Sequence, residues 1–258
     1  RTHDALRLRI GADHMQRLSS EGAADDELVD VVELASHQEL DSGPACADLG
    51  ARISIQDGPI AKVQWVRFRS GEPARVIFLV HHLSVDAVSW RILLDDLTHA
   101  YQHPDDRPPP AESALAYSRA LALSVDSGGF DSHLAHYDSM ATLARRAAAA
   151  QFSWPPGASH VEFVVASTVV DPSVSSAAET LRARRVEVIL GALALALADT
   201  IAHDELLLDV EGHGRELEPG GMDTSRLVGW LTALFPIALD LRGASRALAA
   251  VLSVKEQM

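Results

Sequence analysis

The sequence has 258 residues, of which 47% are hydrophobic, and this is ample for a sizeable buried core. Its 36 acidic residues outnumber the 22 basic ones and give a formal net charge of -14. Such a chain repels phosphate backbones, and no basic stripe offsets the repulsion, so nucleic acid is not expected as a partner. Cys46 is the only cysteine, which excludes an intrachain disulfide and a thiolate-rich zinc site and predicts a reducing, cytoplasmic location.

The first part of the chain predicts strands more often than helices. Ala5 to Ile10 alternates apolar and polar residues, as a half-buried strand does. Residues 22–48 are acidic and irregular and predict one or two short helices and a loop. A Gly-Pro turn then separates two strand-like runs in residues 53–68. The continuous apolar run Ala74 to Val80 predicts a strand in the middle of a sheet.

The next segment predicts a loop and then helices. The histidine pair of HHLSVDAVSW (residues 81–90) is expected in a short loop. Leu93, Leu97 and Tyr101 then recur at helical spacing, with Val88 and Ile92 beside them. Four prolines in residues 103–113 interrupt this pattern, and the alanine-rich residues 114–150 again predict helices. The sequence SWPPGASH (residues 153–160) marks a domain boundary, so we expect an N-terminal lobe over residues 1–152 and a C-terminal lobe over 153–258.

The second lobe is predicted to repeat this layout. We expect strands at residues 161–167, 205–210 and within 225–241, a buried helix over 188–198, and an amphipathic helix over 245–258. The apolar run Val188 to Ala198 is shorter than the roughly 20 residues that a membrane span needs, so no membrane association is expected. The central strand at 205–210 runs directly into EGHGRE (residues 211–216).

Each lobe therefore ends a core strand on a polar cluster, where ligand crevices open in layered α/β folds. His81 and His82 are adjacent, so on extended backbone only one ring can face a given crevice. One is expected to be catalytic and the other structural, although a histidine beside a core strand can also simply bond backbone carbonyls. Asp86 can cap the following helix or pair with Arg215, and the sequence leaves both open. EGHGRE by itself is also compatible with an ordinary loop.

A metal site is not expected in these clusters. His81, His82, Asp86 and His213 are residue types that bind zinc, but HHxxxD lacks the helical spacing of His-Glu-x-x-His.

Six segments, taken in order, resemble the core motifs of the epimerization domains of nonribosomal peptide synthetases, within the condensation-domain superfamily. They are HDALRLR (3–9), DGPIAKV (57–63), HHLSVDAVSWRILLDDL (81–97), VEGHGRE (210–216), VGWLTALFP (228–236) and SVKEQM (253–258). EGHGRE followed by VGW favours epimerization over peptide-bond formation. Members of the family extend beyond both ends of this sequence, so the chain is expected to be trimmed at both ends.

The resemblance implies an α/β chloramphenicol-acetyltransferase-like fold, in which two lobes, each a β-sheet flanked by helices, surround a central tunnel. It implies a peptidyl carrier protein and neighbouring synthetase modules as partners. The carrier's phosphopantetheine arm presents an aminoacyl or peptidyl thioester, whose Cα is epimerized without an intrinsic cofactor.

The resemblance also assigns roles to individual residues. His82 and Glu211 match the catalytic acid/base pair, and His81, Asp86 and Arg215 match supporting positions. Ser89, His213 and Trp230 are expected to line or shape the tunnel. The alternatives are a condensation-type acyl or peptidyl transferase, in which His82 would assist an attacking amine, and a non-catalytic carrier-docking module.

Overall fold

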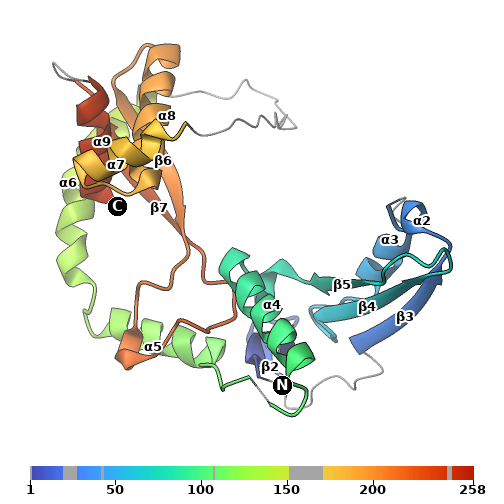
Figure 1. Ribbon diagram of the computed structural model, residues 1–258. Helices are drawn as coiled ribbons and strands as arrows, with labels where there is room; N and C mark the ends of the chain where they lie inside the picture. Colours follow the sequence, from blue (N-terminus) through green and yellow to red (C-terminus); the bar gives the residue numbers. More distant parts are fainter. Residues whose placement is uncertain (1, 20–27, 42–43, 107, 151–170, 243–245) are drawn as a thin grey trace. The chain divides into compact units, whose positions relative to one another are not determined.

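The chain folds into two compact units, each made from two separate stretches of sequence (Figure 1). The computed structural model describes residues 2–19, 28–41, 44–106, 108–150, 171–242 and 246–258. Unit 1 comprises Arg1–Gly129 and His213–Ala233, and unit 2 comprises Phe130–Gly212 and Leu234–Met258. We call residues 213–233, which leave unit 2 between two of its strands and belong to unit 1, the strap. The boundary expected between residues 152 and 153 and the strand expected at 161–167 lie outside the described residues.

Unit 1 contains two small sheets with helices beside them. Its elements are η1 (Asp4–Arg7), β1 (Leu8–Ile10), β2 (Gln16–Leu18), β3 (Val29–Leu34), α2 (His37–Asp41), α3 (Pro44–Ala51), β4 (Ala61–Phe68), β5 (Arg75–Val80), η2 (His82–Ser84), α4 (Ala87–Gln102), α5 (Ala114–Asp126) and η3 (Pro219–Gly221). Strands β1 and β2 pair antiparallel. In the other sheet β4 lies between β3, to which it is parallel, and β5, to which it is antiparallel (Figure 1).

Four expectations for unit 1 require correction. The strand-like run expected before the Gly-Pro turn is not a strand, since residues 53–60 are turns and irregular backbone and only β4 follows. The strand expected from Ala5 starts only at Leu8, and residues 4–7 form the 3-10 helix η1 instead. The Asp4 carboxylate holds η1 in place, because it accepts hydrogen bonds from the Ser113 hydroxyl and the Ala114 amide at the start of α5. Residues 22–48 contain a strand, β3, in addition to helices. Its alternation of apolar and polar residues is hard to recognise in the sequence because acidic residues surround it. Within the described residues, β5 is an edge strand and β4 the middle one. The apolar run of β5 reflects packing on both faces, through Ile77 on one and Val80 on the other.

A hydrophobic cluster lies beneath the loop that follows β5. Its buried members are Ala5, Val85, Ile92 and Val228, which come from η1, the loop, α4 and the strap. Side chains distant in sequence thus meet in one core, and the strap is packed into unit 1 rather than laid over it.

Unit 2 packs helices against a pair of strands. Its elements are α6 (Asp131–Ala150), α7 (Ser173–Leu181), α8 (Arg185–Ile201), β6 (Glu205–Gly212), β7 (Ala233–Asp240) and α9 (Arg246–Gln257). Strands β6 and β7 pair, and their buried residues form one core with α8 and α9. Gly191 lets these helices approach closely, since a Cβ there would lie 2.8 Å from the Val251 side chain. The helices expected over 114–150, 188–198 and 245–258 and the strand expected at 205–210 are confirmed in type.

Two further contacts tie unit 2 together. The Arg146 guanidinium on α6 donates to both carboxylate oxygens of Glu205, at 2.7–3.2 Å, at the start of β6. The Gln257 side-chain amide on α9 donates to the Ala238 carbonyl at 2.6 Å and accepts from the Ala238 amide at 2.7 Å. Sheets flanked by helices confirm the α/β class. None of the helices in the described ranges is long and apolar enough to cross a membrane.

Candidate functional site

The structure gives the two adjacent histidines different surroundings. Strand β5 ends at Val80, and the His81 amide still donates to the Ile60 carbonyl at 3.0 Å. The His81 Nδ1 then accepts a hydrogen bond from the Leu83 amide at 3.2 Å, which fixes the ring against the turn η2. His82 is exposed, and within the described part of unit 1 its ring nitrogens have no hydrogen-bond partner. His81 therefore supports the turn, whereas the ring nitrogens of His82 remain available within the described part of unit 1.

Trp230, on the strap, lies beside His82. The two rings meet edge to face, with centroids 5.5 Å apart and planes at 70°. Aromatic pairs prefer this geometry because a ring edge carries partial positive charge and a ring face partial negative charge. The strap thus places an aromatic side chain, Trp230, against the His82 ring.

Asp86 performs both of the roles that the sequence left open. One carboxylate oxygen, Oδ1, accepts from the Ser89 amide and the Ser89 hydroxyl, each at 2.8 Å, and so caps α4. Oδ1 and Oδ2 also accept from the two terminal nitrogens of Arg215, at 3.0 and 2.8 Å. Oδ2 accepts from the Leu231 amide as well, at 3.1 Å. Capping and the ion pair coexist because a carboxylate offers several acceptor positions.

The strap is held in unit 1 by this buried cluster. Arg215 donates further hydrogen bonds to the carbonyls of Leu227 and His213, so none of its terminal nitrogens is left without a partner. Burial opposes ionisation of Asp86, but hydrogen bonds from Arg215 and Ser89 outweigh it and hold the pKa of the carboxyl below its ordinary value. The pair is therefore ionised at neutral pH and fixes the strap to the start of α4.

The structure refines the expected roles of Ser89 and His213. Ser89 is fully buried, and its hydroxyl oxygen accepts from the Gly229 amide at 3.1 Å and lies 2.9 Å from the Gly229 carbonyl. It shapes the site by fixing the VGW backbone and does not itself face a ligand. His213 is half exposed: its Nδ1 accepts from the Arg215 amide, and its Nε2 lies 3.2 Å from the Glu216 carboxylate. His213 thus orders the strap's first turn.

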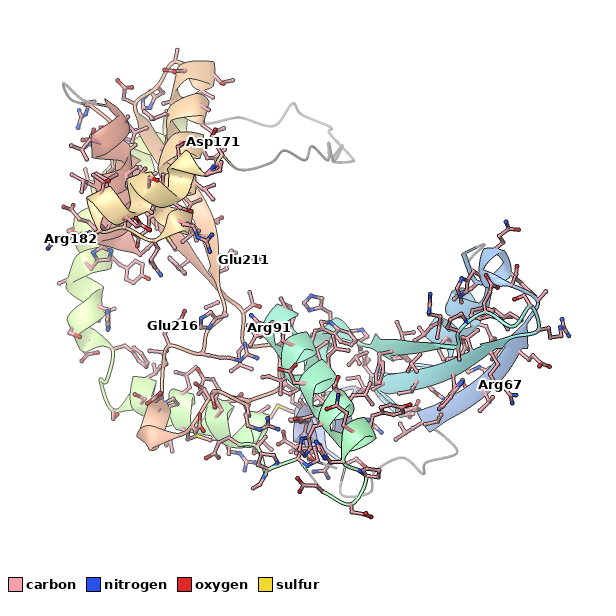
Figure 2. All side chains as sticks on the ribbon, in the orientation of Figure 1. Arg67, Arg91, Asp171, Arg182, Glu211 and Glu216 are labelled. Atoms are coloured by element: carbon pink, nitrogen blue, oxygen red, sulfur yellow. The ribbon has the colours of Figure 1, made fainter. Side chains whose placement is uncertain are left out.

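Glu211 belongs to unit 2 and is not part of this cluster. It is exposed near the end of β6, one residue before the strand ends (Figure 2). Within the described part of its own unit, its carboxylate has no hydrogen-bond or ion-pair partner. The structure therefore brings together Asp86, Arg215, Ser89 and the His82–Trp230 pair, and leaves Glu211 available on a separate strand.

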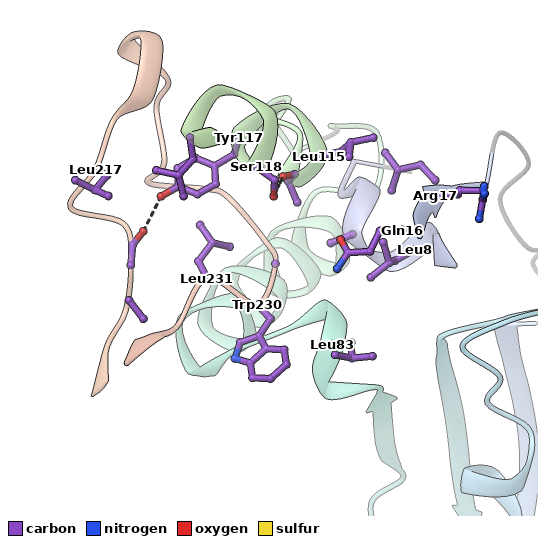
Figure 3. A pocket seen from close by; sticks show the side chains of 17 residues that line it. Leu8, Gln16, Arg17, Leu83, Leu115, Tyr117, Ser118, Leu217, Trp230 and Leu231 are labelled. Atoms are coloured by element: carbon purple, nitrogen blue, oxygen red, sulfur yellow. Dashed lines mark hydrogen bonds between the residues drawn. The ribbon is translucent and has the colours of Figure 1, made fainter. Parts of the chain in front are cut away.

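A pocket of about 360 Å³ is lined in part by Trp230 (Figure 3), whose ring meets the His82 ring. Leu83, which follows His82, and Trp230 lie on one side of it, and Leu115, Tyr117 and Ser118 of α5 lie on the other. Sequence reasoning missed these α5 residues, because their helical spacing signals only burial. Tyr117 is the clearest of them. Its hydroxyl donates to the Gly214 carbonyl at 2.9 Å, and burial raises its pKa.

Gly214 is required at that position by its backbone. Its φ is +66°, and a Cβ would lie 1.8 Å from the Leu231 carbonyl oxygen. Gly214, the second glycine of EGHGRE, thus allows two stretches of the strap to come into contact. Across the residues that the structure describes, no three or more His, Cys, Asp or Glu side chains gather as a metal ion would require.

Comparisons with known proteins agree with the condensation-domain resemblance of the motifs. The family model described as "Condensation domain" matches residues 1–258. Chondramide synthase cmdD of Chondromyces crocatus is 33% identical over 99% of this chain and 7% of its own length. Bacitracin synthase 3 of Bacillus licheniformis is 28% identical over 93% of this chain and 4% of its own. The chain thus spans less than a tenth of these two relatives.

Solved structures share the fold. The epimerization domain from the third module of tyrocidine synthetase B superposes with a TM-score of 0.77 at 23% identity, over 98% of this chain and 61% of that one. The first condensation domain of the calcium-dependent antibiotic synthetase, in complex with a substrate analogue, has a TM-score of 0.66 at 17% identity, over 99% and 61%. At these identities the likeness establishes the fold alone.

Proposed function

The chain belongs to the condensation-domain family, and on this premise we propose that it epimerizes the Cα of a carrier-bound thioester in nonribosomal peptide synthesis. The substrate would be an aminoacyl or peptidyl thioester on the phosphopantetheine arm of a peptidyl carrier protein. The single observation that carries the proposal is the pairing of charges in the two motifs. Asp86 forms an ion pair with Arg215 and the His213 ring lies 3.2 Å from the Glu216 carboxylate, whereas His82 and Glu211 lack partners in the described part of their own units.

The chemistry needs two such groups. One takes the proton from Cα, and the electrons of the broken C–H bond pass to the thioester carbonyl as an enolate. The other returns a proton to the opposite face, so that the bond re-forms inverted and no oxidant or cofactor is consumed. We assign His82 and Glu211 to this pair. Transfer of an acyl group to an amine needs a base such as His82 but no opposing carboxylate.

Solvent deuterium incorporation at Cα tests the proposal. The substrate is an aminoacyl thioester loaded on the carrier, and the variants are His82→Ala and Glu211→Gln. Glu216→Gln is the matched control, because it removes a carboxylate from the same motif that is already engaged with His213. We expect incorporation and loss of chirality in the parent and in the control, and at least a hundredfold loss in both test variants.

The same assay separates the alternatives. No incorporation by a folded, carrier-binding parent would refute epimerization. If that parent joined a second, amine-bearing substrate to the thioester, a condensation-type transferase would remain. If it bound the carrier and did neither, a non-catalytic docking module would remain.

A further inference from the structure

We propose that the pocket beside Trp230 receives the side chain of the amino acid whose Cα is epimerized, and that it selects apolar side chains up to aromatic size. This inference rests on the proposed function and adds a substrate class to it.

The position of the pocket suits this role. Leu83 lines it and directly follows His82 in the chain, and Trp230 lines it while its ring contacts the His82 ring. A substrate side chain is attached to the carbon that loses the proton. The space for that side chain must therefore lie close to the group that moves the proton, and this pocket is lined by two residues next to His82.

The lining is suited to an apolar occupant. Aliphatic and aromatic side chains form most of the wall: Leu8, Leu83, Leu115, Leu121, Trp230 and Leu231. The hydroxyls of Tyr117 and Ser118 are already bonded to backbone carbonyls, at 2.9 Å each, so Tyr117 offers its ring and not a free donor. Arg17 at the edge is paired with Asp13. The wall thus presents no unpaired charge that would compensate a charged side chain for leaving water.

The size of the pocket sets an upper limit on the occupant. Its volume of about 360 Å³ lies near the lower end of the range for small-molecule sites. It therefore suits one amino-acid side chain and not a peptide segment. Gly229 also lines the pocket, and the wall there is closely packed, since a Cβ would lie 2.8 Å from the Leu231 side chain and 3.3 Å from Ala114.

A larger side chain on α5, placed so that it fills the pocket, tests the inference. Ser118→Trp adds an indole at a lining position whose hydroxyl bonds its own helix, at Ala114. Arg119→Trp places the same group on the next residue, which is exposed and does not line the pocket. The probes are alanyl, leucyl and phenylalanyl pantetheine thioesters, and the readout is the rate of deuterium exchange at Cα.

We expect the parent and Arg119→Trp to exchange leucyl and phenylalanyl thioesters at least about tenfold faster than alanyl. Ser118→Trp should lose this preference, because its leucyl and phenylalanyl rates should each fall at least about tenfold. Leu121→Ala, which widens the pocket, should favour phenylalanyl over leucyl and gives an independent reading if Ser118→Trp fails to fold.

The outcomes distinguish the two proposals. Exchange by the parent with no side-chain preference, or an equal effect of Ser118→Trp on all three probes, overturns the subsite and leaves epimerization intact. No exchange of any probe, by a parent that also fails on the loaded carrier, overturns the proposed function and the subsite with it.

Discussion

Asp86 and Arg215, which are 129 residues apart in sequence, form a buried ion pair with two hydrogen bonds, at 2.8 and 3.0 Å. Their side chains are only 3% and 5% exposed. The carboxylate also caps α4, and the guanidinium also bonds the strap's own carbonyls. Each partner therefore satisfies groups that would otherwise be buried without hydrogen bonds.

Removal of one partner should be strongly destabilising. Asp86→Asn leaves the Arg215 charge buried and unpaired, and we expect the free energy of unfolding to fall by about 3–5 kcal/mol. Glu216→Gln removes an exposed partner of His213 and should change it by less than about 1 kcal/mol. Urea unfolding monitored by circular dichroism checks both values. Equal losses in the two variants would contradict the role assigned to the buried pair.

Acid should weaken the same contact. Hydrogen bonds hold the pKa of Asp86 below its ordinary 3.8 in the folded protein, despite burial. The folded state therefore binds fewer protons than the unfolded state in mild acid. The stabilisation is complete above about pH 5 and declines as the pH falls through about 4 toward the folded-state pKa. Urea unfolding between pH 3 and 7 should show a shallower decline for Asp86→Asn than for the parent.

Gly214 should tolerate no side chain, for reasons beyond its dihedral angle. Gly214 and Gly71 both have positive φ, +66° and +81°, but a Cβ at Gly71 would meet nothing within 4 Å. Gly71→Ala should cost about 1–2 kcal/mol of unfolding free energy. Gly214→Ala should cost about 3 kcal/mol or more, because the methyl group would overlap the Leu231 carbonyl. Thermal or urea unfolding gives the difference, and similar costs would show that the strap relaxes around the methyl group.

The two histidines should separate catalysis from stability. His82→Ala should abolish Cα deuterium exchange and leave the unfolding free energy within about 0.5 kcal/mol, since the ring is exposed. His81→Ala should lower the unfolding free energy by about 1 kcal/mol, because the Leu83 amide loses its acceptor. Exchange rates and urea unfolding of both variants check this. A stable His81→Ala with lost exchange, beside an active His82→Ala, would reverse the assignment.

Gln257 should behave as part of the sheet although it lies on a helix. Gln257→Leu leaves the buried Ala238 amide and carbonyl without their side-chain partners, so we expect a loss of about 2 kcal/mol or more in unfolding free energy. The neighbouring Glu256 is exposed, and Glu256→Ala should have little effect. Hydrogen exchange at the Ala238 amide gives a local measurement. Unchanged protection there in Gln257→Leu would contradict the contact.

The sequence predicted those features that depend on local pattern. The helix over residues 188–198 and the strand at 205–210 have unmistakable apolar runs, and both form. Strand β3 was missed because the alternation in VDVVEL lies among acidic residues, and its pairing partner is β4, which is distant in sequence. Position within a sheet also depends on distant partners, and for this reason β5 was misplaced.

The candidate site likewise has features that the motifs predicted and features that only the fold reveals. The motifs identified Asp86 and Arg215, but only the fold shows that capping and ion pairing use the same carboxylate. Burial of Ser89 and the contribution of Tyr117 to a pocket arise from the strap, whose path no local pattern encodes. The assignment of Glu211 stays a prediction.

The strap also has a consequence for the order of folding during synthesis. Unit 1 is complete only when residues 213–233 are present, because Arg215, Val228 and Gly229 supply its ion pair, part of its core and its contact with Ser89. A ribosome therefore has to release most of unit 2 before the first unit can close. Arrest peptides placed at successive lengths should show the force of that closure only once residue 233 has left the exit tunnel.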